Sequence, residues 1–193
     1  MNRDNLLKSI AETGYNVGFG AKKHFATYDI VDKVPGLIGF LGISAGIIGL
    51  VFEVLSSKIP SAALAILGVA ALYISFYDHK KEDYAKAGVA LTLLFNELRD
   101  LYRSVQDGAD LAGSSLALKD IESRFHANSI SKQILLSDWY AHYKFFLQMQ
   151  IDWVDEQKKF RITDKIPFSG AFWLIVITLS AAILFFARCY ISR

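Results

Sequence analysis

The side chains that could act as catalysts or metal ligands are scattered along this chain rather than grouped in a motif. The four histidines are His24, His79, His126 and His142, and none stands in an H-E-x-x-H pair. No Ser/His/Asp arrangement typical of a hydrolase is seen. The single cysteine, Cys189, excludes an intramolecular disulfide and a multi-cysteine metal site. The sequence therefore predicts a protein that is not an enzyme and that uses no metal ion or cofactor.

One ionisable side chain interrupts a long apolar run. Glu53 is the single charge in residues 37–55, and an ionisable residue at membrane depth is by default a functional hypothesis. In an oligomer, Glu53 would form a ring of carboxylates at a pore mouth and favour cations. Alternatively, Glu53 reaches the outer lipid headgroups near Lys58. The sequence favours neither interpretation over the other.

Two basic clusters are candidates for binding a nucleotide or a single-stranded oligonucleotide. The net charge is only +2, so bulk charge does not indicate a nucleic-acid partner. In the second cluster, however, the ring of Phe125 is available to stack on a base. The candidate ligand-binding residues are Lys22, Lys23, His24, Arg124, His126 and Lys132. An alternative for the first cluster is a basic segment lying against lipid headgroups, with Phe19, Phe25 and Tyr28 at the interface.

Three apolar runs dominate the elements that would position these residues. Residues 37–55, 59–77 and 168–187 contain 19, 19 and 20 residues, and a 19-residue helix covers about 28 Å of the roughly 30 Å hydrocarbon core of a bilayer. The link between the first two runs carries Lys58 and Pro60, so the chain turns back there. The sequence predicts an all-α membrane protein with a transmembrane helical hairpin, a long cytoplasmic helical stalk and a third, C-terminal transmembrane helix.

The basic residues indicate the orientation of these spans. Eighteen of the 21 lysines and arginines lie in residues 1–34 and 78–166, which three spans place on one side of the membrane. That side is expected to be the cytoplasm. The predicted parts are a cytoplasmic amphipathic N-terminal segment (1–34), the transmembrane hairpin (35–77), the cytoplasmic helical stalk (78–166) and the third span with a short outer tail (167–193).

Small residues line one face of the first span. Gly39, Gly42, Gly46 and Gly49 recur in steps of three and four, which allows another helix to approach closely. We expect these glycines, together with Glu53, to line a pore in a homo-oligomer, with a tetramer as the first expectation. Packing within the hairpin, without a pore, accounts for the same face about as well.

The remaining segments are also predicted to be helical. Residues 3–13 form a short amphipathic helix, which glycines at positions 14, 18 and 20 break or loosen. Pro35 and Pro167 each stand near the start of a span, where a missing N–H costs little. The second span is expected to continue as one helix to about residue 106. A loop at 107–115, a short helix to about residue 125 and a last helix over residues 131–160 complete the stalk.

A heptad pattern marks the predicted continuation of the second span. Apolar residues recur at positions 84, 87, 91, 94, 98, 101 and 105, the alternation of three and four that a coiled-coil seam shows. We expect this seam to hold subunits or neighbouring helices together. Its oligomer-forming residues would be Leu91, Leu94, Leu98, Leu101 and Val105.

Three short runs carry a likeness to a known family. They are residues 15–25 (YNVGFGAKKHF), 35–40 (PGLIGF) and 76–81 (FYDHKK). With the layout of the hairpin, they resemble the SLATT group, bacterial two-transmembrane effectors found with nucleotide-making SMODS enzymes, SLOG nucleotide sensors or reverse transcriptases. The resemblance covers about residues 5–105 and supplies no catalytic motif. A third span departs from the two-span pattern.

The resemblance implies a function that the membrane hairpin and the seam support. We expect a homo-oligomeric, ion-conducting pore of the bacterial inner membrane, an effector of anti-phage abortive infection with a periplasmic or extracellular C-terminus. A nucleotide or oligonucleotide from a partner nucleotidyltransferase or reverse transcriptase would gate it. The alternative is a non-conducting membrane scaffold or receptor that recruits a cytoplasmic partner through its helical stalk.

Overall fold

The computed structural model describes residues 2–167 and residue 178 of the chain. Within these residues it contains helices and no strand, so the all-α prediction is confirmed for this part. The chain divides into two units, residues 1–158 and residues 159–193, and each is considered by itself. The helices of the first unit are α1 (Arg3–Gly49), α2 (Lys58–Ser75), the 3-10 helix η1 (Asp78–Lys80), α3 (Lys81–Gln106), α4 (Leu111–Asn128), α5 (Ser137–Gln148) and α6 (Asp152–Lys158).

In the second unit, the described residues include one short 3-10 helix, η2 (Ile162–Lys165). The backbone N–H of Arg161 donates to the Asp164 carboxylate at 2.8 Å, and this hydrogen bond caps the first turn of η2. The predicted third span at residues 168–187 and the outer tail lie outside the described residues, apart from the single position 178.

Helix α1 is unbroken over 47 residues, so the predicted break at glycines 14, 18 and 20 is wrong. Its first turn is capped by Asn2, whose side-chain oxygen accepts from the N–H of Asn5 at 2.9 Å. The three glycines are positions of close packing: a Cβ at Gly14 would lie 2.3 Å from the ring of Trp153, and one at Gly18 would lie 2.9 Å from the ring of Phe95. Aromatic rings of the same chain therefore fill the space that these glycines leave.

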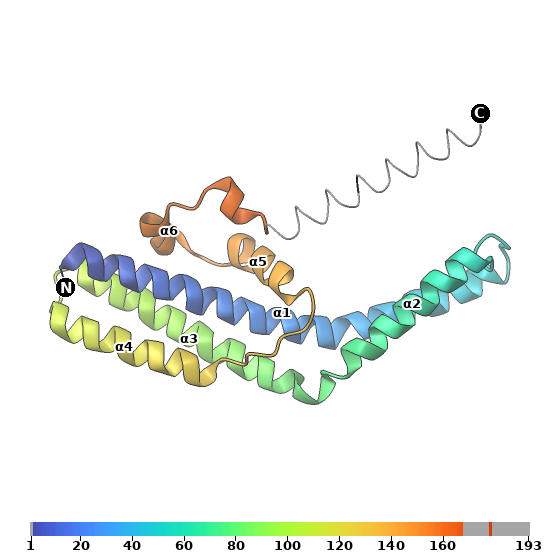
Figure 1. Cartoon of the computed structure of the whole chain (residues 1–193), viewed down its shortest axis with the longest axis horizontal. Helices are drawn as coiled ribbons and strands as arrows, with labels where there is room; N and C mark the ends of the chain where they lie inside the picture. The colour runs from blue at the N-terminus through green and yellow to red at the C-terminus, as the bar shows by residue number, and fades with distance from the viewer. Residues whose placement is uncertain (1, 168–177, 179–193) are drawn as a thin grey trace. The chain divides into compact units, whose positions relative to one another are not determined.

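The first half of α1 lies in a helical bundle with α3, α4, α5 and α6 (Figure 1). The heptad positions of α3 form its buried face, because Leu91, Leu98 and Val105 are fully buried and Leu94 nearly so, while Leu101 is partly buried. Helix α3 packs against α1 of the same chain. Four of the five residues expected to form an oligomer seam are thus buried within one chain, and the predicted helical stalk is a bundle built on α1.

The predicted single helix over residues 131–160 is two helices, α5 and α6, separated by extended backbone at Met149. The break has a geometric reason. Phe145 of α5 packs at Gly18 and Trp153 of α6 packs at Gly14. A continuous helix would hold two residues eight positions apart at about 12 Å, whereas two glycines four positions apart on α1 are separated by about 6 Å. Breaking the helix lets both rings reach α1.

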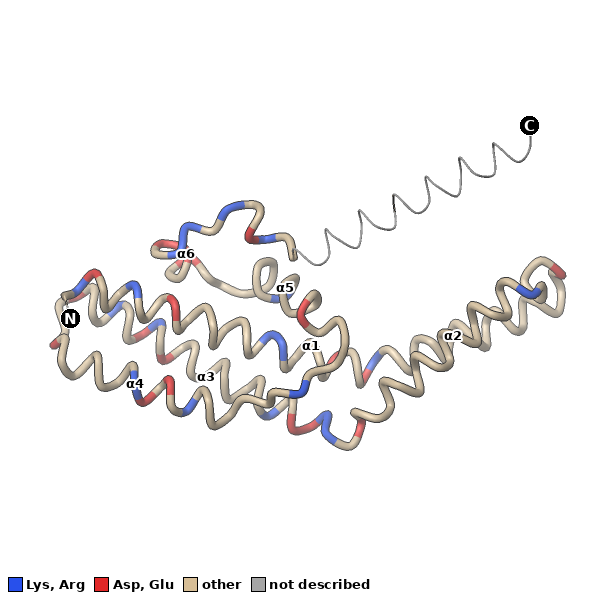
Figure 2. The backbone as a smooth tube through the Cα atoms, viewed as in Figure 1, with Lys and Arg blue, Asp and Glu red and all other residues tan. Residues whose placement is uncertain are grey.

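The second half of α1 and α2 form the apolar hairpin (Figure 1). Both are long and apolar enough to cross a membrane, and only 6% of the most apolar window of each is buried. Charged residues are distributed along the helices of the bundle and are absent from the hairpin arms except around the link (Figure 2). The turn occupies residues 50–57, so Lys58 and Pro60, which were predicted to lie in the link, stand in the first turn of α2, where proline is tolerated.

Two predicted helix boundaries near the membrane are wrong. Pro35 lies inside α1 rather than at the start of a helix, so the carbonyl of Val31 lacks its usual helical donor. The second span does not run on into α3, because α2 ends at Ser75 and η1 intervenes. This elbow is tied to α1 by Lys81, whose Nζ lies 3.3 Å from carboxylate oxygens of both Asp32 and Asp78.

Candidate functional site

The six residues predicted to bind a ligand do not form one site. Lys22, Lys23 and His24 lie on the bundle half of α1, and Arg124 and His126 lie on α4. Lys132 lies in the non-helical segment between α4 and α5, residues 129–136, which we call the strap. Each is considered in turn, because local partners decide which side chains remain available.

His24 is a buried structural residue rather than an exposed ligand. Its side chain is 3% exposed, and Nδ1 lies 2.7 Å from the carbonyl oxygen of Gly20. The backbone N–H of Ile130 in the strap donates to Nε2 at 2.9 Å. These partners require a neutral ring with its proton on Nδ1. Burial lowers the pKa of His24; the hydrogen bond to Gly20 opposes this, and the charge of Lys23 adds to it. Both ring nitrogens are occupied, so neither is free for a ligand.

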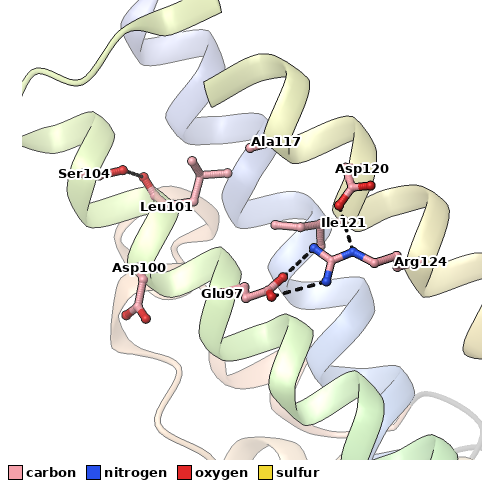
Figure 3. A pocket seen from close by; sticks show the side chains of 8 residues that line it. All are labelled: Glu97, Asp100, Leu101, Ser104, Ala117, Asp120, Ile121 and Arg124. Atoms are coloured by element: carbon pink, nitrogen blue, oxygen red, sulfur yellow. Dashed lines mark hydrogen bonds and ion pairs between the residues drawn. The ribbon is translucent and has the colours of Figure 1, made fainter. Parts of the chain in front are cut away.

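Arg124 lies in a cavity of about 320 Å³ between α3 and α4 (Figure 3). Its guanidinium binds both carboxylate oxygens of Glu97, at 3.2 and 2.6 Å, and its Nε lies 2.8 Å from Asp120. Asp100 also lines the cavity, but its carboxylate lies 3.6 Å from Arg99, so two carboxylates, those of Glu97 and Asp120, face the one guanidinium. This excess of negative charge repels a phosphate. Arg124 holds α4 against α3 and is a poor candidate for binding a nucleotide.

The lysines of the first cluster differ in their partners. Lys23 pairs with Asp138 of α5 at 2.6 Å. Lys22 is half-buried, and neither an ion pair nor a hydrogen bond is seen for it among the described residues. Burial lowers the pKa of Lys22, and the nearby charge of Lys144 lowers it further. Lys144 is itself paired with Asp29. Lys22 is therefore a cation with spare hydrogen-bonding capacity beside a second cation.

The last two predicted residues lie apart from Lys22. His126 is exposed on α4, with its ring centroid 5.2 Å from that of Phe125. Lys132 places its ammonium 5.3 Å from the ring centroid of Tyr77, a cation–π contact. The lipid-interface interpretation also fails for Phe19, whose ring packs against Phe145 at 6.0 Å between centroids, and for Phe25, which packs on Gly88 of α3.

A second cavity, of about 170 Å³, lies between α3 and α6 and was not expected from the sequence. The Tyr102 hydroxyl donates to Glu156 at 2.8 Å inside it. Two arginines and two carboxylates line it, so the charges balance and no anion is favoured. The lining residues are Arg99, Tyr102, Arg103, Gln106, Gln150, Asp152, Trp153 and Glu156. They are brought together from segments about 50 residues apart, a proximity that local sequence patterns do not indicate.

The predicted pore-lining glycines have open space beside them. A Cβ added at Gly39, Gly42 or Gly46 would meet no atom within 4 Å, and one at Gly49 would meet only the link, at 3.7 Å or more. The hairpin therefore does not use this face for its own packing. Glu53 is exposed in the link, beyond the end of α1, rather than within the span.

Comparison with known proteins gives a family and no close relative. No curated protein matches the chain, and no solved structure matches it. A family model described as "SMODS and SLOG-associating 2TM effector domain 6" matches residues 1–175, which extends well past residues 5–105. The two apolar helices agree with the two transmembrane segments in that description. The chain belongs to this SLATT family of membrane effectors of bacterial defence systems.

Proposed function

We propose that this protein is a homo-oligomeric pore whose opening is controlled by the state of its bundle. The observation that carries the proposal is the continuity of α1, which is one helix from the buried core of the bundle into the apolar hairpin. A helix transmits displacement along its length through its backbone hydrogen bonds, and in α1 Pro35 removes the one to the carbonyl of Val31. A rearrangement among α3, α5 and α6 therefore moves the hairpin arm.

The open glycine face of the hairpin supports assembly with other copies of the chain. Gly39, Gly42 and Gly46 lie along one side of α1 without a neighbour from the same chain. Association of helices in membranes depends on close packing through small residues. Helices from several copies, tetrameric in the first instance, would meet through this face around an axis, with Glu53 of each link at one mouth.

The bundle would receive an anionic signal such as a nucleotide or oligonucleotide. Of the six predicted ligand residues, Lys22 is the best placed to contact a phosphate, since it lacks an ion pair among the described residues and Lys144 stands near it. Lys23 and Lys132 are secondary candidates. We assign the source of the signal to a partner nucleotide-synthesising enzyme, in keeping with the family description. The bundle would then face the cytoplasm of a bacterial inner membrane.

Ion flux from liposomes containing the purified full chain tests this function. Addition of candidate nucleotides should change flux, and Lys22→Gln should weaken that response while leaving basal flux unchanged. Lys86→Gln, an exposed lysine on α3, is the matched control. The pore is contradicted if the chain enters the bilayer but conducts no ions, whichever nucleotide is added and at whatever concentration.

A second candidate, the non-conducting scaffold, is favoured by one observation on α5. Tyr143 and Leu147 are one helical turn apart and are 50% and 71% exposed, an apolar pair that a protein partner would cover. Under this alternative, Tyr143→Ser with Leu147→Ser abolishes recruitment of the partner, and no variant alters ion flux. Loss of flux in the Gly42→Leu variant would decide for the pore.

A further inference from the structure

The strap is bound to the bundle by hydrogen bonds from two helices. The Ile130 N–H donates to His24 of α1 at 2.9 Å, and the Tyr84 hydroxyl of α3 donates to the carbonyl of Lys132 at 2.6 Å. Thr27 of α1 donates to the side chain of Gln133 at 2.5 Å. His24, Thr27 and Tyr84 are all buried, so these hydrogen bonds are shielded from competing water.

The same strap contacts the base of the hairpin. Ile134 is buried in a small cluster with Val31 of α1 and Ile74 in the last turn of α2. The Lys132 ammonium lies over the ring of Tyr77, just beyond α2. Val31 is also the residue whose carbonyl loses its helical donor to Pro35. One eight-residue segment thus binds the bundle through its hydrogen bonds and the hairpin through Ile134.

We propose that the strap is an acid-sensitive latch that couples the bundle to the hairpin: neutral His24 holds it closed, and protonated His24 releases it. The ring offers one acceptor, Nε2, and the Ile130 N–H uses it. Protonation places an N–H opposite another N–H, which removes the hydrogen bond and leaves a buried cation. The latch goes beyond the proposed function because it needs no ligand. Its effect on conduction rests on that function.

The surroundings of His24 set the direction of the response. Lys23 precedes it on α1 and is paired with Asp138 of α5. Tyr84 faces it from α3, with ring centroids 6.3 Å apart, and the strap presents the Lys132 backbone beside Tyr84. Burial, together with the charge of Lys23, lowers the pKa of His24 in the closed state. The released histidine binds a proton more readily, so the closed latch loses stability as the pH falls below the ordinary histidine pKa of about 6.5.

Hydrogen–deuterium exchange of the full chain in lipid nanodiscs tests the latch without reference to conduction. Exchange of peptides covering residues 129–136 and 73–80 is compared at about pH 8 and about pH 5.5, on either side of the histidine pKa, with the intrinsic chemical rate corrected. We expect protection of both peptides to fall about tenfold at the lower pH, the loss of about one hydrogen bond. Protection that is equal at both values overturns the latch.

Three variants assign the effect to His24. His24→Gln keeps a side-chain acceptor for Ile130 but does not titrate, so protection should remain high at both pH values. His24→Leu removes the acceptor and should leave the strap unprotected at both. His126→Gln, at an exposed histidine on α4, should respond to pH as the wild type does. A His24→Gln chain that still loses protection at low pH overturns the assignment.

Two further measurements keep the outcomes separate. In the wild type, the NMR titration of the His24 ring must coincide with the change of the Ile130 amide signal; a mismatch contradicts the latch even if no variant folds. In liposomes, acidification should change ion flux in the wild type and not in His24→Gln. A strap that opens without any change in flux overturns the coupling, whereas a wild type that conducts under no condition contradicts the proposed pore and leaves the exchange result standing.

Discussion

The two halves of α1 use the same residue type in opposite ways. In the bundle half, Gly14, Gly18 and Gly20 lie against aromatic rings, with a notional Cβ only 2.3 to 3.2 Å from Trp153, Phe95 and Phe125 respectively. In the hairpin half, glycines at 36, 39, 42 and 46 have no such neighbour within 4 Å. The glycines of the bundle half are covered by aromatic rings of the same chain, whereas those of the hairpin half are left uncovered by the chain itself.

This difference separates the glycines that fold the chain from those available for assembly. A ring packed on a glycine fixes one helix against another, because the interior has no room for adjustment. A glycine face exposed in a membrane segment gains nothing for the isolated chain and costs helix propensity, about 1 kcal/mol for each residue relative to alanine. Substitutions in each half should therefore have different consequences, and the following predictions compare them.

The largest effect is expected on the buried face of α3, which packs against the bundle half of α1. Leu98→Asp buries a carboxylate in the fully buried face of α3 and should destabilise the bundle by about 4 kcal/mol. Thermal unfolding by circular dichroism in detergent measures it. Leu93→Asp, at a 61% exposed leucine of the same helix, is the control and should change stability by about 0.5 kcal/mol or less. If Leu98→Asp separates subunits while the bundle stays folded, the seam lies between chains.

The next largest effect on stability is expected from replacing a glycine by alanine, and it should differ between the two halves of α1. Gly14→Ala forces a Cβ against Trp153 and should cost about 2 kcal/mol, even though alanine is the better helix former. Gly42→Ala enters open space in a single chain and should leave the unfolding temperature of detergent-solubilised monomers unchanged or slightly raised. A clear loss of stability in the Gly42→Ala monomer would show that the hairpin face is already covered within the chain, and the comparison would fail.

What could be predicted from the sequence follows from which interactions are local. Apolar runs and heptads are local patterns, so the hairpin and the buried face of α3 were expected, including Leu91 and Leu98. Glycines were expected to break α1, since propensity alone disfavours them in a helix. The packing of Gly14 on Trp153 joins residues more than 130 positions apart. The hydrogen bond between His24 and the strap, which leaves the His24 ring with no free nitrogen for a ligand, joins residues 106 positions apart.

Bulk on the hairpin face should affect function rather than folding. Gly42→Leu and Gly46→Leu fill the small-residue face and are expected to remove most of the conductance while the protein still reaches the membrane. Gly68→Leu is the matched control, because Gly68 of α2 also has no neighbour within 4 Å but is not one of the predicted pore-lining residues. Planar-bilayer recordings compare the three. Equal conductance in all of them would remove α1 from the pore.

The smallest effect is expected at the hairpin link. Glu53 is exposed beyond the end of α1, so solvent screens its charge. Glu53→Gln keeps nearly the same volume and should reduce cation preference modestly without changing assembly. Reversal potentials in a salt gradient measure the change, and Lys58→Gln, the nearby cation of α2, should shift them in the opposite direction. Identical reversal potentials in both variants would move the selective region away from the link.

The order of residues along the chain also governs how the protein can be made. The hairpin is complete at Ser75, before any residue of α3, α4, α5 or α6 has been synthesised. The first half of α1 therefore leaves the ribosome without the rings that later fill its glycines, and an unsupported helix with such gaps is marginal in water. Insertion of the hairpin into the bilayer can therefore precede folding of the bundle. A nascent chain that is not inserted exposes both the apolar hairpin and the uncovered glycines of α1 to quality-control proteases.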